Sequence, residues 1–290
     1  MSKFREIVEK NLKKCSFYPK GVYRLLEDEK AVLFEELGEL SEETLQTLCE
    51  VNQALVDRNN YLTDDLVQLI LPALNNIPKS IIPSPIKVNG RFSYKLLIDD
   101  PNHNFPDVHL ACLDDFAGTY TYPPKIITLD ILDYDDKIDP YKLEQFKLEH
   151  KYSTISHELE HDNQRELLRA LGKPTVYWNR ATNINNDYTE LDAFYYQVAK
   201  STQMELLRRM PHSIRDKAKT ETLDNIFKQE VQDIIQKLLK NDPTSAPVFN
   251  LLSEKHKKHA FQYIYSQAKD FYTQQYKAYN LMYEAERKAP

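Results

Sequence analysis

Apolar positions along this chain of 290 residues change their spacing twice. Before about residue 80 they recur every three to four residues, the period of helices. From 86 to about 132 they alternate, as in strands, and the helical period then returns. We therefore expect an α+β fold that is predominantly helical, with a small mixed sheet and helical N- and C-terminal flanks. The expected regions are a helical one over 1–80, a core over 81–210 and a second helical one over 211–290.

The alternating region contains a strong hairpin signal. In "IKVNGRFSYKLLI", Asn89 and Gly90 lie between apolar-alternating flanks, and both residue types tolerate a positive φ. "DVHLACL" and "KIITLDIL" predict further strands, because they are rich in apolar and β-branched residues. The segment 77–87, "IPKSIIPSPIK", carries three prolines, which favour extended chain and predict a linker.

The segment "STISHELEHDNQREL" places two histidines four residues apart within a helical pattern. Residues i and i+4 share a helix face, so His157 and His161 can bind one zinc ion at about 2.0–2.1 Å each. Glu158 points about 100° away, where it can reach a water on the zinc but not the ion. Zinc lowers the pKa of that water, and Glu158 can act as its general base. This spacing predicts a hydrolytic metal site.

A catalytic zinc needs a third protein ligand and an open fourth position. "NNDYTELDAFYYQ" offers Glu190 in a helix expected to start near Asp187. The small residue Ala193 lies on the same face and allows this helix to approach the first one closely. Asp187 and Asp192 are the alternatives. Asp192 lies about 200° round the helix from Glu190, so at most one of these two can face the ion.

From here the chain resembles the gluzincin metallopeptidases, especially their compact minigluzincin members. The resemblance is carried by a strand over 125–132, the "HELEH" helix, and the later "ELDA" beginning at Glu190. It implies a zinc-dependent endopeptidase in which that strand is the sheet edge that binds substrate in extended form. It also implies the same roles for the site residues: His157, His161 and Glu190 as zinc ligands and Glu158 as general base. We expect the sheet to pack on the "HELEH" helix and the flanks to shape a cleft for a protein or peptide substrate.

Two positions depart from this family. Many relatives have a glycine before the second histidine, where this chain has Glu160. Many also have an acidic residue four positions after the ligand glutamate, where this chain has Phe194. The first change adds a hydrogen-bond acceptor near the site. The second removes a partner that would orient a ligating histidine.

The residue that would stabilise the oxyanion in such a reaction is left open by the sequence. The tyrosines nearest to the motifs are Tyr120, Tyr122, Tyr188, Tyr195 and Tyr196. A second histidine pair, His256 and His259 in "EKHKKH", is flanked by lysines, whose charge opposes cation binding. We expect that pair to lie on a solvated helix face.

Charge and composition narrow the class of protein. The net charge of -6 argues against a general nucleic-acid binder. The three cysteines lie far apart without a CxxC pair, which favours a reducing, cytoplasmic-type compartment. We expect a soluble protein without a signal peptide, because the first residues lack an apolar core and the run over 66–74 is too short to span a membrane. Delivery into another cell by a non-classical route is compatible with these features.

The alternatives to an enzyme are a binding protein in which zinc only staples the fold, and a helical interaction protein with an accidental motif.

Overall fold

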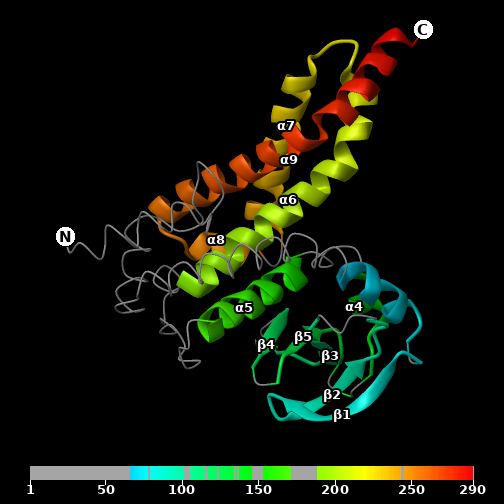
Figure 1. The fold of residues 1–290 in the computed structure, drawn as a ribbon, viewed down its shortest axis with the longest axis vertical. Coiled ribbons are helices and arrows are strands. Elements are labelled where there is room, and N and C mark those ends of the chain that lie inside the picture. Colours follow the sequence, from blue (N-terminus) through cyan, green and yellow to red (C-terminus); the bar gives the residue numbers. More distant parts are fainter. Residues whose placement is uncertain are drawn as a thin grey trace, which may run out of the picture. The chain divides into compact units, whose positions relative to one another are not determined.

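The computed structural model describes most of the chain from residue 66 onward. The described ranges are 66–77, 79–100, 105–114, 117–122, 124–133, 135, 137–145, 153–170, 188–242 and 245–289, with backbone only at 145, 166–170 and 188. The described residues up to 170 belong to one compact unit and those from 188 to a second. Helices dominate, with one small sheet (Figure 1), so the predicted α+β class is confirmed. The helical region predicted over 1–80 lies outside the described residues up to residue 65.

The first unit is built on a five-stranded sheet in the order β1-β2-β3-β5-β4. β3 and β5 pair in parallel, and the other neighbouring strands are antiparallel, so the sheet is mixed as expected. Its strands are β1 (Ile81–Val88), β2 (Arg91–Leu96), β3 (Asp107–Ala111), β4 (Gly118–Thr121) and β5 (Ile126–Asp130).

The predicted hairpin is present, and its first strand is longer than predicted. Asn89 and Gly90 have φ values of 50° and 78° and connect β1 to β2. The segment expected to be a linker is instead largely strand β1, which contains Pro83 and Pro85. β1 lies at the sheet edge, where a proline costs no ladder hydrogen bond on its outer side, and its register shifts between Pro83 and Lys87. The prolines therefore mark an edge strand rather than a linker.

The strand expected at the other edge is an inner strand. β5 lies between β3 and β4, and the edge position belongs to β4. The physical reason is visible in the burial of the two strands: four of the five residues of "IITLD" in β5 are buried, which is typical of a strand covered on both faces. "GTYT" in β4 is short and partly exposed. Its weak alternation explains why the sequence did not predict it.

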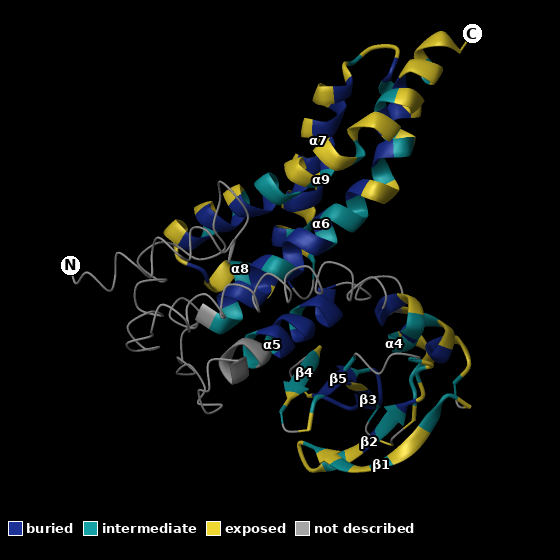
Figure 2. Ribbon diagram, in the orientation of Figure 1, coloured by how far each residue is buried: buried dark blue, intermediate teal, exposed yellow. Residues whose placement is uncertain are grey.

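Helices pack against this sheet. The helix over 66–75 and α5 (Ser153–Ala170) bury apolar side chains against it, and α4 (Pro140–Gln145) precedes α5. α5 contacts β4 and β5, which confirms that the sheet packs on the "HELEH" helix. Figure 2 shows α5, β3 and β5 largely in the colour of buried residues. The shared core includes Leu66, Ile70, Leu74, Val108, Leu110, Ile127, Leu129, Ile155 and Leu159. None of the described helices is both long enough and apolar enough to cross a bilayer.

The second unit consists of helices in the described part of the chain. They are α6 (Tyr188–Lys217), α7 (Leu223–Asn241), α8 (Ser245–Leu251) and α9 (Glu254–Lys288). α6 packs on both α7 and α9. The start of α6 matches the predicted start near Asp187. The helix continues through Pro211, so the boundary predicted between 210 and 211 lies inside it.

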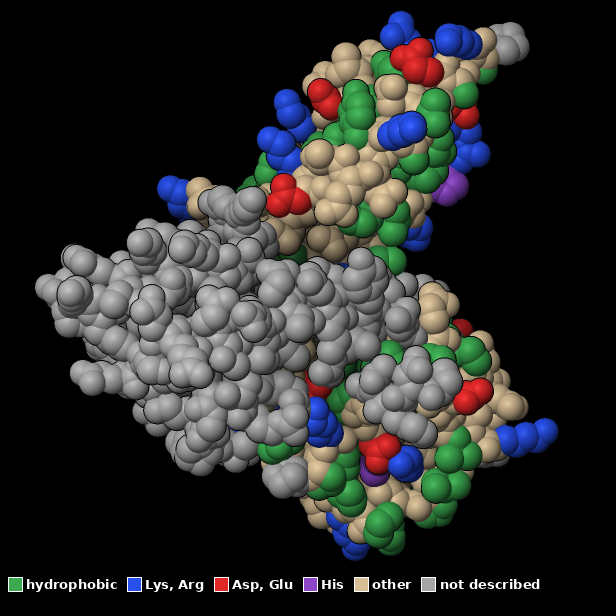
Figure 3. All heavy atoms as spheres, in the orientation of Figure 1, with side chains coloured by type: hydrophobic (Ala, Val, Ile, Leu, Met, Phe, Trp, Pro, Cys, Tyr) green, Lys and Arg blue, Asp and Glu red, His purple; other side chains and the backbone are tan. Residues whose placement is uncertain are grey.

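A buried carboxylate joins α6 to α7. Glu230 of α7 accepts a hydrogen bond from Ser213 Oγ at 2.7 Å and forms an ion pair with Arg209 Nε at 2.9 Å. Arg209 meets Oε2, whereas Lys217 Nζ lies 3.5 Å from Oε1, the oxygen to which Ser213 donates. On the face of this unit that Figure 3 shows, Lys and Arg side chains are mixed with acidic and hydrophobic ones. The polar contacts of Glu230 compensate for the cost of burying its charge.

Candidate metal centre

The two motif histidines face each other on α5. Their Nε2 atoms lie 3.2 Å apart and their rings meet edge to face at 81°. Two nitrogen ligands on one tetrahedral zinc, each at 2.0–2.1 Å, are separated by about 3.3 Å. The spacing of His157 Nε2 and His161 Nε2 therefore fits a shared ion without rearrangement of α5.

A glutamine on the same helix orients the second histidine. Gln164 Oε1 lies 2.9 Å from His161 Nδ1. In the tautomer with the proton on Nδ1, that nitrogen donates to Oε1 of Gln164, and Nε2 keeps its lone pair for a metal. Gln164 therefore gives a ligating histidine an orienting partner, the role that an acidic residue at position 194 has in the gluzincin pattern and that Phe194 cannot take. The sequence signal was a polar residue three positions after His161, on a neighbouring part of the helix surface.

Glu158 lies on the sheet side of α5, beside the edge strand. Its side chain is 6% exposed. A Cβ atom built on Gly118 of β4 would lie 3.3 Å from Glu158 Oε1 and 2.5 Å from Thr154 Cγ2. Only glycine therefore allows β4 to approach this closely. The carboxylate of Glu158 lies beside the backbone of the sheet edge.

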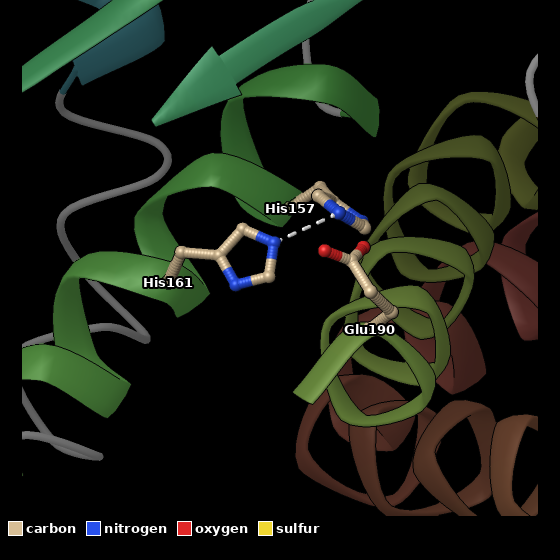
Figure 4. A group of neighbouring side chains, drawn as sticks. All are labelled: His157, His161 and Glu190. Atoms are coloured by element: carbon tan, nitrogen blue, oxygen red, sulfur yellow. Dashed lines mark hydrogen bonds between the residues drawn. The ribbon is translucent and has the colours of Figure 1, made fainter. Parts of the chain in front are cut away.

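Among the candidates for the third ligand, Glu190 is the one grouped with the histidines. It lies in the first turn of α6, and the ligand atoms of His157, His161 and Glu190 all lie within 4.8 Å of one another (Figure 4). This is the single such group of three or more metal-ligating side chains in the part of the chain that the structure describes. Asp192 is not in it, and Asp187 lies outside the described residues. Because Glu190 and the histidines belong to different compact units, ligation by Glu190 stays a prediction.

The two positions that differ from the gluzincin sequence pattern are both buried. Glu160 is buried, and Asn163 Nδ2 donates to its Oε2 at 3.4 Å. Phe194 is buried in α6, where its ring lies 6.0 Å from that of Tyr195. An acidic side chain at position 194 would be buried, which is costly unless it is paired, so an apolar residue suits this position.

Two of the five tyrosine candidates for oxyanion stabilisation have other partners. The Tyr120 hydroxyl donates to Asp162 Oδ1 at 2.7 Å. The ring of Tyr195 packs between His259 and Tyr263 of α9, inside the second unit. The side chain of Tyr188 is not described, whereas Tyr122 and Tyr196 are half-buried and stay candidates.

The prediction of a solvated face for His256 and His259 is wrong. The two side chains are 6% and 8% exposed. α9 packs against α6 as well as α7, so a wide part of its surface is buried. The neighbouring lysines suggest a solvated face, but the two histidines lie on the covered part of α9.

Comparison with known proteins does not identify the chain: no family model, no curated protein and no solved structure matches it. Function is therefore inferred from the side chains themselves. Two histidines with one glutamate are a ligand set that catalytic zinc sites use. The donor atoms present, two imidazole nitrogens and a carboxylate oxygen, fit that ion.

Proposed function

We propose that this protein is a zinc-dependent endopeptidase that hydrolyses peptide bonds of a protein substrate. His157, His161 and Glu190 would hold the ion, and Glu158 would be the general base. The observation that supports this most is the 3.2 Å separation of the histidine Nε2 atoms, which suits a shared metal ion. A zinc ion held there supplies a Lewis acid that lowers the pKa of water toward neutrality.

Glu158 would move the protons of the reaction. Its carboxylate accepts a proton from the attacking water and later returns that proton to the leaving amine. Burial beside β4 keeps bulk water from competing for the carboxylate, which strengthens its interactions. Gln164 would act on the metal site before substrate binds. Its contact with Nδ1 of His161 would keep Nε2 of that ring available as a ligand.

The substrate would be bound as an added strand. The gluzincin resemblance implies an extended substrate along the sheet edge nearest to the motif helix, and in this sheet that edge is β4. Main-chain hydrogen bonds supply affinity in this binding mode, with little demand on sequence. The opposite edge, β1, carries Pro83 and Pro85 and is less suited to pairing.

The decisive experiment combines metal analysis with cleavage. Purified protein should contain one zinc per chain and should cut an unfolded protein such as casein, with new termini mapped by mass spectrometry. Glu158→Gln should keep the zinc and lose cleavage, because the amide cannot accept the proton. Glu144→Gln, which changes an exposed glutamate on α4, is the matched control and should cleave normally.

Each other outcome has a defined meaning. Full turnover by Glu158→Gln would refute the proposed mechanism. Stoichiometric zinc without cleavage of any substrate would instead favour the zinc-stapled binding protein. Absence of zinc would favour the helical interaction protein, in which the histidine motif arose by chance.

A further inference from the structure

A buried cluster connects α5 to the edge strand. Asp162, directly after His161, is fully buried on α5. Its Oδ1 accepts a hydrogen bond from the Tyr120 hydroxyl of β4 at 2.7 Å. The same oxygen lies 3.3 Å from Nζ of Lys125, which directly precedes β5. One carboxylate oxygen thus connects the helix with β4 and with the start of β5.

This cluster lies one helical turn from Glu158. Glu158 and Asp162 are i and i+4, so they share the face of α5 that meets β4. On the strand, Gly118 and Tyr120 are i and i+2 and share one face as well. Gly118 approaches Glu158, and Tyr120 bonds Asp162. Two residues of strand rise about 6.8 Å and four residues of helix about 6 Å, so the two contacts match in spacing.

We propose that Tyr120, Asp162 and Lys125 hold β4 in register on α5, so that the Glu158 carboxylate lies beside Gly118 and faces a peptide strand paired with β4. This inference rests on the proposed peptidase function. The three residues are positioning residues: they act through the place of β4, and none of them is assigned a contact with metal or substrate.

The chemistry of the cluster favours this role over simple packing. A buried carboxylate carries a large desolvation cost, and an apolar side chain of similar size would often pack with equal or better stability. What the carboxylate adds is direction, because a short hydrogen bond and an ion pair define where Tyr120 and Lys125 lie. The contact also argues against Tyr120 as the oxyanion donor, because a phenol has one hydrogen to donate and Asp162 accepts it.

The test uses the chain of 290 residues with zinc bound, and the variants Tyr120→Phe, Asp162→Asn and the double mutant. Tyr94→Phe is the matched control, because Tyr94 of β2 packs on the same core and its hydroxyl makes no hydrogen bond among the described residues. Three kinds of measurement are made on each protein. They are zinc per chain, hydrogen exchange of the peptide covering 117–122, and kcat and KM on fluorescently labelled casein.

We expect all variants to keep one zinc per chain. The β4 amides of Tyr120→Phe should exchange about tenfold faster, because a hydrogen bond to a charged acceptor is lost. Its kcat should fall about 10- to 100-fold with KM changed less than about threefold, since small misplacements of a catalytic group are costly. The double mutant should lose no more than the more affected single mutant, because both changes break the same contact. Tyr94→Phe should match the wild type in all three.

Exchange of β4 at the wild-type rate in both Tyr120→Phe and Asp162→Asn would overturn the inference, and so would loss of zinc from either. A wild-type protein that cleaves no substrate, casein included, would refute the peptidase proposal instead. The hydrogen-exchange measurement would still decide the role of the cluster in that case.

Discussion

Two histidine pairs lie on helices of this protein, and they differ in what their nitrogens meet. His157 and His161, four residues apart on α5, are half-buried and bring their Nε2 atoms within 3.2 Å. His256 and His259, three apart on α9, are buried, and the ring of His259 meets Tyr195 edge to face. Only the first pair joins a third metal-ligating side chain within the described ranges. Burial alone therefore does not distinguish a candidate ligand from a packed histidine, whereas the convergence of two ring nitrogens does.

The largest expected effect separates the two pairs directly. Replacing both His157 and His161 with Ala should reduce zinc from one per chain to less than about 0.1, since a single remaining carboxylate cannot hold the ion. The change of both His256 and His259 to Ala should leave zinc at one per chain and lower unfolding stability by about 1–3 kcal/mol, as for other buried truncations. Elemental analysis and urea unfolding measure the two effects. Equal zinc loss in both double mutants would mean that the two histidine pairs do not differ as metal ligands.

Glu190 and Asp192 of α6 are the next two residues to compare, as candidates for the third zinc ligand. Glu190→Gln should weaken zinc binding more than about 100-fold, because removing a ligand should cost more than the 10- to 100-fold that removing an outer partner costs. Asp192→Asn, about 200° away round the helix, should change zinc affinity less than about threefold. Competition with a fluorescent zinc chelator gives both affinities. The reverse ranking would make Asp192 the third ligand.

A smaller effect is expected at Gln164. Gln164→Leu should weaken zinc binding about 10- to 100-fold, because His161 loses the partner that holds Nε2 in its unprotonated form. Gln164→Glu keeps an acceptor oxygen at the same position and should restore affinity to within a few-fold of the wild type. Chelator competition again provides the measurement. Equal binding by the Leu variant and the wild type would show that the contact does not tune the site.

These comparisons also show how far the sequence alone could lead. Local signals were sufficient where one residue type has one conformational meaning, as in the Asn89-Gly90 turn or the i, i+4 spacing of the "HELEH" histidines. The sequence failed where a residue's role depends on partners distant in the chain. Pro83 and Pro85 are compatible with a linker and with an edge strand, and only the pairing of β1 with β2 decides between them.

The same limit applies within the site. In the sequence, Asp162 looks like an ordinary charged residue on a polar helix. Nothing near it in the sequence indicates that Tyr120, 42 residues earlier, donates a hydrogen bond to it. Likewise, the burial of His256 and His259 follows from the packing of α9 on α6, which their lysine neighbours obscure. Periodicity predicts which face of a helix is apolar, but not which polar side chains on the remaining surface are covered.

The smallest expected effect concerns a third kind of histidine, one buried in the sheet. His109 of β3 lies with its Nδ1 3.3 Å from Ser93 Oγ. Burial lowers its pKa below the usual 6.5, against a weaker opposite effect of Asp107. The folded state therefore favours the neutral ring, while the unfolded chain takes up a proton near pH 6.5. The stability that His109 contributes is present above that pH and is lost as the pH falls through the folded-state pKa.

His109→Gln should remove this dependence, because glutamine keeps hydrogen-bonding groups but does not titrate. Between pH 7.5 and 5.5, the free energy of unfolding of the wild type should fall more steeply than that of the variant, by at most about 1.4 kcal/mol per pH unit. Urea unfolding of both proteins in a chelator measures the difference without a contribution from metal release, and all other residues are identical in the two proteins. Parallel pH profiles would mean that His109 is protonated as easily in the folded sheet as in the unfolded chain, and that its burial, unlike the geometry of the α5 pair, has no chemical consequence.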